Sequence, residues 1–277
     1  MGDESSVDVQ VRKVSGSAFA TERDVLAVEE PLEIRLGYHF KGRAQSKSIS
    51  LTMRTPGNDR ELAVGFLAGE GIVRHARDIT GIRHIGIGAS NELQVDLDES
   101  VDVDITRLER HFYTTSSCGV CGKTSLEAIQ TRGAFAVPME GFTMPAAKIH
   151  DLPAVSRAAQ PVFAQTGGLH AAALFDGDRK LLDLREDVGR HNALDKLIGH
   201  QFLTGALPLH NRVLLVSGRI SFELMQKAVM AGLPMVAAIG APSSLAVELA
   251  EQFHVTLLGF VRDNQFNVYS GHWRITP

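Results

Sequence analysis

The sequence contains few cysteines and no long apolar segment. Its only two cysteines, Cys118 and Cys121, stand close together in a chain of 277 residues, which excludes a disulfide scaffold. The longest nearly apolar run, residues 228–241, is too short to span a bilayer and is interrupted by Gly232 and Pro234. The acidic N-terminal segment has no apolar core of the kind that secretory signals contain. We therefore expect a protein of the reducing cytoplasm, without membrane association.

A large excess of charge of either sign is also lacking. The 28 basic and 32 acidic residues leave a formal net charge of −4 at pH 7, which argues against a nucleic-acid-binding protein. Hydrophobic residues make up 44% and charged residues 22%, a composition typical of a chain that buries a core. At about 150 residues per domain, the length predicts one large domain or two modest ones.

The first 110 residues are expected to be mainly β. Residues 1–22 are polar and lack periodicity, so we predict a loose tail there, and we assign residues 23–110 to a β-rich part. A helix capped by Asn58 or Asp59 is expected to end near Gly71. The expected strands, two of which alternate apolar and polar residues, are residues 24–36, 47–53, 93–97 and 101–105.

Residues 111–277 are predicted to form an α/β domain. Three continuous apolar runs alternate with two helical stretches that begin at serines, the pattern of parallel βαβ units. The runs are residues 213–216, 235–239 and 255–258, and the helices are residues 221–231 and 244–253. Before them, a hairpin is expected around residues 176–178, followed by a helix over residues 190–203.

Residues 114–124 carry the most reactive chemistry in the sequence. Gly119 and Gly122 allow unusual backbone conformations, and the preceding Thr and Ser residues offer little to bury, so we predict an exposed loop with two thiols. A thiol of pKa near 8.5 is only about 3% thiolate at pH 7. Lys123 and the start of a following helix would lower that pKa. The loop therefore favours nucleophilic sulfur chemistry.

Three other interpretations of the cysteine pair stay open. A structural zinc site needs further ligands, and His111, His150 and His170 have no compact ligand spacing. A thioredoxin-like centre needs a strand directly before the motif, where this chain has Thr and Ser. Two inert buried cysteines fit poorly beside glycines and a lysine. We accordingly predict no bound metal.

Polar residues follow the predicted strands of the α/β domain, at the edge where such sheets bind ligands. Arginines there suit phosphate, and Asp263 and Asn264 would read base edges. The pattern predicts an anionic, nucleotide-like ligand, although residues 185–196 also fit a capped helix with a solvated face and His170 fits a structural role. The polar segments are residues 167–170, 185–196, 217–219, 241–244 and 259–264.

Several of these motifs together resemble the FdhD family. The resemblance extends over roughly residues 24–275 and is specific because the motifs are long and occur in order. The matching segments are residues 30–34, 53–57, 117–123, 166–171, 185–196, 217–221, 241–246 and 259–262.

The resemblance implies an α/β fold with a cytidine-deaminase-like layered mixed sheet, a smaller β-rich N-terminal part and a homodimer. It implies a sulfurtransferase, a sulfur carrier required for formate dehydrogenase activity. Such proteins accept persulfide sulfur from a cysteine desulfurase and pass it to the molybdenum of the bis(molybdopterin guanine dinucleotide) cofactor before its insertion into formate dehydrogenase. Deamination is not implied, because the His/Cys-x-Glu half of the deaminase zinc signature is absent.

The resemblance also implies roles for particular residues. Cys118 would carry the persulfide and Cys121 would help to discharge it, whereas local electrostatics favour Cys121 as the carrier because it lies closer to Lys123. Alternative functions are a chaperone that only binds the cofactor and a dithiol oxidoreductase. The residues expected to contact the cofactor and its guanine nucleotide are Phe260, Val261, Arg262, Asp263, Asn264 and Gln265.

Overall fold

The protein is described here by a computed structural model that covers residues 5–86, 91–103, 134–262 and 264–277. Its described part is a mixed α/β structure with a four-stranded sheet, a six-stranded sheet and two smaller two-stranded sheets. The predicted boundary at residue 110 and the predicted cysteine loop at residues 114–124 lie outside the described residues.

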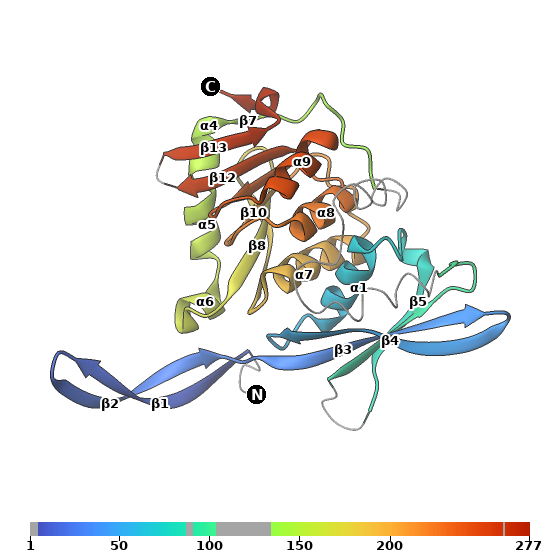
Figure 1. Cartoon of the computed structure of the whole chain (residues 1–277), viewed down its shortest axis with the longest axis horizontal. Coiled ribbons are helices and arrows are strands. Elements are labelled where there is room, and N and C mark those ends of the chain that lie inside the picture. The colour runs from blue at the N-terminus through green and yellow to red at the C-terminus, as the bar shows by residue number, and fades with distance from the viewer. Residues whose placement is uncertain (1–4, 87–90, 104–133, 263) are drawn as a thin grey trace.

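Residues 6–27 form a protruding β-hairpin, so the prediction of a loose tail over residues 1–22 is wrong for residues 6–22. Strands β1 (Ser6–Ser15) and β2 (Ala18–Ala27) pair antiparallel along their whole length. Figure 1 shows this hairpin extending away from the rest of the protein. Ion pairs between Lys13 and Glu22 and between Arg23 and Asp8 join the strands across exposed faces. The hairpin escaped prediction because neither of its faces is buried in a core, so its apolar alternation is weak.

The four-stranded sheet has the order β4-β3-β6-β5. Its strands are β3 (Glu30–Phe40), β4 (Arg43–Arg54), β5 (Ile79–His84) and β6 (Glu92–Leu97). The expected strands over residues 47–53 and 93–97 are confirmed. The predicted strand over 24–36 is instead divided between β2 and β3. The strand expected from residue 101 is wrong for residues 101–103, which are irregular; Val101 and Val103 pack against the core without pairing.

The six-stranded sheet has the order β13-β12-β11-β10-β8-β9. Strands β10, β11 and β12 pair parallel, as predicted, while β8, β9 and β13 run antiparallel to their neighbours. The antiparallel pair β8–β9 confirms the predicted hairpin at residues 176–178. The strands are β8 (His170–Phe175), β9 (Leu181–Asp187), β10 (Val213–Val216), β11 (Met235–Ala238), β12 (Thr256–Arg262) and β13 (Gln265–Ser270).

Helices cover both faces of this sheet (Figure 1). In β10, Leu214 and Val216 belong to the core shared with α7, α8 and α9, whereas Val213 and Leu215 belong to the core shared with α4 and α5. Burial on both faces explains why the strands are continuously apolar. The helices are α4 (Ala146–His150), α5 (Leu152–Ala158), α7 (Arg190–Leu203), α8 (Phe222–Met230) and α9 (Ser244–Gln252). None of the described helices is long and apolar enough to cross a membrane.

Helix α1 (Asp59–Gly69) joins the two sheets, because it packs on α7 and contributes to the core beneath β3 and β6. Its N-cap is Asn58, one of the two predicted residues, although the Asn58 side chain accepts no hydrogen bond from the helix. Where α1 crosses α7, glycines allow the backbones to meet. A Cβ atom at Gly65 would collide with the carbonyl oxygen of Asp195, and one at Gly199 would collide with that of Glu61.

We expect Gly65→Ala to destabilise the protein by about 1–3 kcal/mol or more, because the two helix backbones must separate to admit the methyl group. Gly69→Ala is the matched control on the same helix. Its Cβ would lie 3.0 Å from the Cγ of Lys227, and a side chain yields more easily than a backbone. Chemical denaturation measures both free energies of unfolding. If both variants lose the same free energy of unfolding, the close contact between the α1 and α7 backbones is not what makes Gly65 necessary.

Candidate functional site

The two predicted catalytic cysteines, Cys118 and Cys121, lie outside the described residues, as does Asp263 of the predicted cofactor segment. The part of the candidate site that the structure describes is the carboxyl edge of the six-stranded sheet, where β10, β11 and β12 end.

The sheet order brings five sequence motifs to this edge. The three parallel strands end there, the antiparallel strand β8 begins there at His170, and His170 lies opposite Asp187 at the end of β9. Backbone hydrogen bonds of 3.1 Å connect the chain across the edge, from the Gly240 N–H to the Gly218 carbonyl and from the Phe260 N–H to the Gly240 carbonyl. The predicted meeting of polar segments at one edge is therefore confirmed.

The predicted cofactor segment is part of a hairpin, and does not follow the last core strand as expected. Phe260, Val261 and Arg262 belong to the end of β12, and Gln265 begins β13. Val261 is fully buried in the core, so its side chain is not available to a ligand. Phe260, Arg262, Asn264 and Gln265 are exposed. The sequence gives no clear signal of this hairpin, because residues 265–270 have only weak apolar alternation.

The hairpin contains an unusual backbone conformation. Phe260 has φ of 54° and Asn264 has φ of 63°. Asn tolerates this left-handed region, whereas it is unfavourable for a bulky residue such as Phe. The pairing of β12 with β13 shifts register between Gly259 and Arg262. This irregularity leaves Phe260 36% exposed beside the fully buried Val261. Such outliers cluster at functional sites.

His170 and Ser217 form a polar pair at the same edge. The Ser217 Oγ accepts a hydrogen bond of 2.9 Å from the Ala171 N–H and lies 3.3 Å from the Nδ1 of His170. Burial lowers the pKa of His170, and the nearby charges of Arg190 and His191 lower it further. In the tautomer whose Nδ1 carries no proton, His170 accepts a hydrogen bond from the Ser217 hydroxyl at this atom. This contact agrees with the structural interpretation of His170.

Helices α7 and α8 begin side by side and are joined by two pairs of side chains. His191 Nε2 lies 2.9 Å from Glu223 Oε2 and 3.3 Å from the Oγ of Ser221. The hydrogen bond from His191 lowers the pKa of Glu223. One turn further along both helices, Lys227 Nζ lies 2.7 Å from Asp195 Oδ1 in a buried ion pair. The alternative of a solvated helix face for residues 185–196 is wrong, because much of this helix surface is buried.

Asp187 binds backbone and side-chain groups at the start of α7, a role that the sequence did not predict. Its carboxylate is fully buried and accepts hydrogen bonds from the N–H groups of Thr55 and Gly189 and from the side chain of Asn192. Lys196 Nζ lies 2.7 Å from Asp187 Oδ2 and donates a 2.8 Å hydrogen bond to the Thr55 carbonyl. The segment after β4 is thus tied to the start of α7. The only sequence signal was the presence of both segments among the family motifs.

No group of three metal-binding side chains occurs among the residues that the structure describes. Of the histidines considered for zinc, His150 packs against Phe266 with ring centroids 5.1 Å apart and ring planes tilted by 45°, and His170 faces Ser217. His111 and both cysteines lie outside the described ranges.

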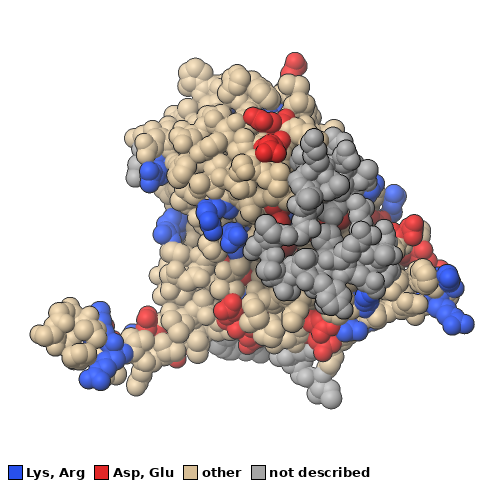
Figure 2. All heavy atoms as spheres, in the orientation of Figure 1, with Lys and Arg blue, Asp and Glu red and all other residues tan. Residues whose placement is uncertain are grey.

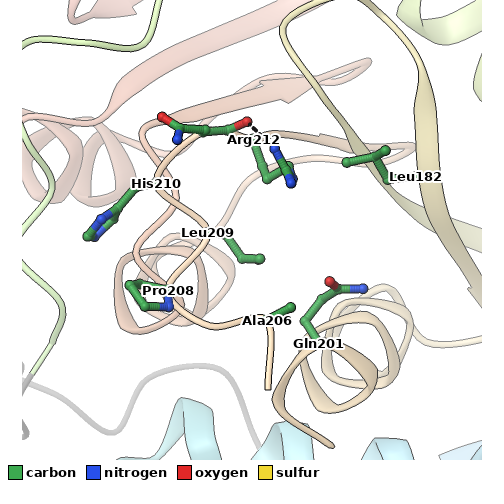
Figure 3. A pocket seen from close by; sticks show the side chains of 8 residues that line it. Leu182, Gln201, Ala206, Pro208, Leu209, His210 and Arg212 are labelled. Carbon is green, nitrogen blue, oxygen red and sulfur yellow. Dashed lines mark hydrogen bonds between the residues drawn. The ribbon is translucent and has the colours of Figure 1, made fainter. Parts of the chain in front are cut away.

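A cavity of about 450 Å³ lies at the opposite edge of the sheet, before β10 begins. Figure 3 shows Gln201, Leu209 and Arg212 around its open centre, with Arg212 bonded to the carbonyl of Asn211. Among the described residues that line it, Arg212 is the only lysine, arginine or carboxylate residue. The polar lining residues of the cavity, which are Gln201, His210, Asn211 and Arg212, do not belong to the sequence motifs that meet at the carboxyl edge.

Comparison with known proteins agrees with the resemblance seen in the motifs. Residues 27–276 match the model of the FdhD/NarQ family. A "Sulfur carrier protein FdhD" of Mycobacterium tuberculosis is 49% identical over 96% of this chain and 97% of its own, and one of Streptomyces coelicolor is 47% identical over 96% and 94%. The crystal structure of a putative formate dehydrogenase accessory protein from Desulfotalea psychrophila matches with a TM-score of 0.73 and 25% identity, covering 98% of this chain and 99% of that one. The chain belongs to the FdhD/NarQ family.

Proposed function

We propose that this protein is a sulfur carrier that serves the maturation of formate dehydrogenase. It accepts persulfide sulfur from a cysteine desulfurase at Cys118 and delivers it to the molybdenum of the bis(molybdopterin guanine dinucleotide) cofactor, which is its substrate and not a resident group. The observation that carries the proposal is the near full-length identity of 47–49% to proteins named sulfur carriers. The presence of both cysteines in this chain agrees with it.

The chemistry balances with the two thiols of this chain. The Cys118 thiolate attacks the outer sulfur of the desulfurase persulfide, so a new S–S bond forms on Cys118 and the desulfurase cysteine leaves as a thiolate. The Cys121 thiolate then attacks the inner sulfur of Cys118. The outer sulfur leaves as sulfide, which is the transferred group, and the two cysteines are oxidised to a disulfide. A dithiol reductant must restore them before the next cycle.

Persulfide labelling tests this proposal against its two alternatives. The purified protein is incubated with a cysteine desulfurase and free cysteine, alkylated, and analysed by peptide mass spectrometry. A sulfur carrier shows an alkylated persulfide on the peptide of residues 114–124. A cofactor-binding chaperone shows none, and a dithiol oxidoreductase shows a Cys118–Cys121 disulfide without extra sulfur and without the release of sulfide that accompanies this disulfide in a carrier. Either of those two results would reject the carrier function.

The cofactor half of the proposal places the guanine end of the cofactor at residues 260–265. Its support is the exposure of Phe260, Arg262, Asn264 and Gln265 at the carboxyl edge, where α/β sheets bind ligands. Val261 would contact the cofactor only through its backbone, because its side chain is buried. The contact between Asp263 and the cofactor stays a prediction from the sequence.

We expect Arg262→Ala to weaken guanosine diphosphate binding by roughly 10- to 150-fold, because a charge-assisted hydrogen bond is worth about 1.5–3 kcal/mol. Titration calorimetry with the full chain measures the affinity. Arg179→Ala, which changes an exposed arginine of the β8–β9 turn, is the control. An Arg262→Ala affinity equal to that of the unchanged protein would remove Arg262 from the site.

The remaining parts of the proposal concern the setting of the protein. We propose that it works in the cytoplasm, as a homodimer, with the desulfurase and formate dehydrogenase as partners. The cytidine-deaminase-like layering of the mixed sheet is a further part of this proposal. Light scattering coupled to size-exclusion chromatography measures the oligomeric state, and a monomeric mass would reject the homodimer.

A further inference from the structure

Exposed apolar side chains gather on the hairpin of residues 6–27, called the arm from here on, and on the strands that follow it. Among the described residues, fourteen large apolar side chains are exposed, and seven of them belong to the arm, β3 and β4. Phe19 is 62% exposed and Leu51 is 66% exposed, the two highest values of the fourteen. Apolar side chains gathered on one part of a surface indicate an interaction site. The seven are Val7, Val14, Phe19, Leu26, Phe40, Leu51 and Met53.

The arm precedes residue 27, where the match to the family model begins, and it has no core of its own. Strands β1 and β2 pair only with each other among the described residues, and most of their side chains are exposed. The ion pairs across the arm lie in solvent and so contribute little. Only its base touches the body, at α6 (Pro161–Thr166). Since a two-stranded hairpin is marginally stable in water unless another surface covers it, the arm needs such a surface.

The chemistry of the arm suits an apolar, uncharged partner surface. Val7 lies opposite Leu26 near the base, and Val14 lies opposite Phe19 near the tip, on the other face. Residues 6–27 contain three acidic and three basic side chains, so two identical arms do not repel each other by net charge. Figure 2 shows uncharged side chains at the far end of the arm, with basic and then acidic side chains nearer to the body.

The outer face of the β3–β4 ribbon offers such a surface. Met53 lies opposite Pro31 and Leu51 lies opposite Glu33, so these four side chains share one face of the ribbon. Leu32, which stands between Pro31 and Glu33, points to the other face and is fully buried in the core. Leu51 and Met53 are both exposed. This face therefore presents apolar side chains away from the core.

We propose that the arm lies on the outer β3–β4 face of a second copy of this chain, in a two-fold dimer whose copies exchange arms. Figure 1 shows the arm and the β3–β4 ribbon nearly in line, on opposite sides of the junction at residues 28–29. A two-fold axis at this junction places each arm alongside the β3–β4 ribbon of its partner. The ribbons match in length, because each arm strand has ten residues and β3 and β4 have 11 and 12. The inference rests on the homodimer of the proposed function and adds the surfaces that form it.

The area that two exchanged arms bury is sufficient for a stable dimer. Ten residues at about 3.3 Å each extend roughly 33 Å, and two paired strands are about 10 Å wide. Each arm would thus cover roughly 330 Å² of its partner, and two arms would bury roughly 1,300 Å² when both surfaces of each contact are counted. Stable interfaces bury about 1,200–2,000 Å². A single arm would bury only half as much, which favours exchange between two copies over docking on another protein.

Two charged variants test the exchange on the full chain, which we expect to be a dimer. Leu26→Lys changes the arm and Leu51→Glu changes the receiving face, both near the proposed two-fold axis. Each variant places a charge in both equivalent contacts of its own dimer. We therefore expect the dissociation constant of the dimer to rise by at least about 100-fold, on the order of tenfold for each contact. Sedimentation equilibrium measures this constant. Leu203→Glu, which changes an exposed leucine at the end of α7, is the matched control and should leave the dimer unchanged.

Mixing the two variants gives the result that distinguishes arm exchange from other dimers. In a mixed dimer, the unchanged arm of the Leu51→Glu copy lies on the unchanged face of the Leu26→Lys copy. The other contact pairs the new lysine with the new glutamate. An equimolar mixture should therefore form dimers again, while each variant by itself stays monomeric. Both substituted side chains are exposed, so neither change should disturb the core.

The outcomes separate this inference from the proposed function. Dimers that persist in both variants would overturn arm exchange and leave the homodimer and the carrier role standing. Monomeric variants that do not recombine would also overturn it, because the two surfaces would then not face each other. A monomeric unchanged protein would overturn arm exchange together with the homodimer, and persulfide labelling of the same sample would still report on the carrier role. If that monomer instead forms a complex with a cysteine desulfurase that Leu26→Lys abolishes, the desulfurase covers the arm and the exchange is wrong.

Discussion

Replacing Cys118 by alanine is expected to abolish sulfur transfer while leaving the fold and nucleotide binding intact. Without the Cys118 thiolate, no S–S bond can form at the residue that is proposed to accept the outer sulfur of the desulfurase persulfide. The fold should survive, because the sequence predicts an exposed loop for residues 114–124, and alanine is smaller than cysteine. Activation of formate dehydrogenase in cell extract measures the function, and persulfide labelling measures the loading step.

Two comparisons make this prediction specific. Cys121→Ala should still load sulfur on Cys118 but release it slowly, because the second thiol is missing. If the alkylated persulfide instead maps only to Cys121, the residue assignment is wrong and the influence of Lys123 decides which thiol is loaded.

Sulfur loading and nucleotide binding should also be separable by mutation. Cys118→Ala should bind guanosine diphosphate normally, and Arg262→Ala should accept sulfur normally. If either well-folded variant loses both activities, the two functions share one fused site, and the idea of a loop that moves between a desulfurase and a separate cofactor site fails.

Replacing Lys227 by methionine should destabilise the protein by about 3–5 kcal/mol, because it leaves a buried carboxylate without its partner. Lys227 Nζ donates to both carboxylate oxygens of Asp195, at 2.7 and 2.9 Å, and both side chains are almost inaccessible to water. Burial alone would lower the pKa of Lys227, but attraction by Asp195 and neighbouring carboxylates outweighs it and raises that pKa. The ammonium group therefore stays charged, and its removal exposes the full cost of burying Asp195. Chemical denaturation measures the loss.

Two further variants test the physical reason for this loss. The double variant Lys227→Met with Asp195→Leu should recover most of the stability, since an apolar pair of similar volume often replaces a buried ion pair without cost. Lys148→Met should cost less than about 1 kcal/mol, because its ion pair with Asp178 is exposed to solvent. If Lys227→Met costs no more than Lys148→Met, the buried pair does not hold α7 and α8 together.

The sequence predicted much of the core because burial leaves a local pattern. A strand covered on both faces must be apolar throughout, so residues 213–216 predicted β10 with its observed bounds. A helix covered on one side shows a stripe of apolar residues along that side, and this stripe in residues 190–203 predicted α7. The parallel pairing of β10, β11 and β12 followed from the helices between them, since parallel neighbours need a crossover. The meeting of polar motifs at the carboxyl edge followed from that pairing.

Only the tertiary structure decided which polar groups touch at that edge. Periodicity shows that a residue faces inward but not which distant residue it meets, so the bond between Lys196 and the Thr55 carbonyl, 141 positions apart, had no sequence signal. The same limit applies to His191, whose contact with Glu223 depends on where α7 and α8 lie. It applies to residues 260–265 as well, because a register shift within a hairpin turns Val261 into the core and Phe260 outward. The sequence alone determined the chemistry available to this protein and the edge of the sheet where most of its polar motifs gather. Their partners, burial and spacing were decided by the packing of the two sheets around α1 and α7, because contacts between segments far apart in the chain depend on the three-dimensional fold.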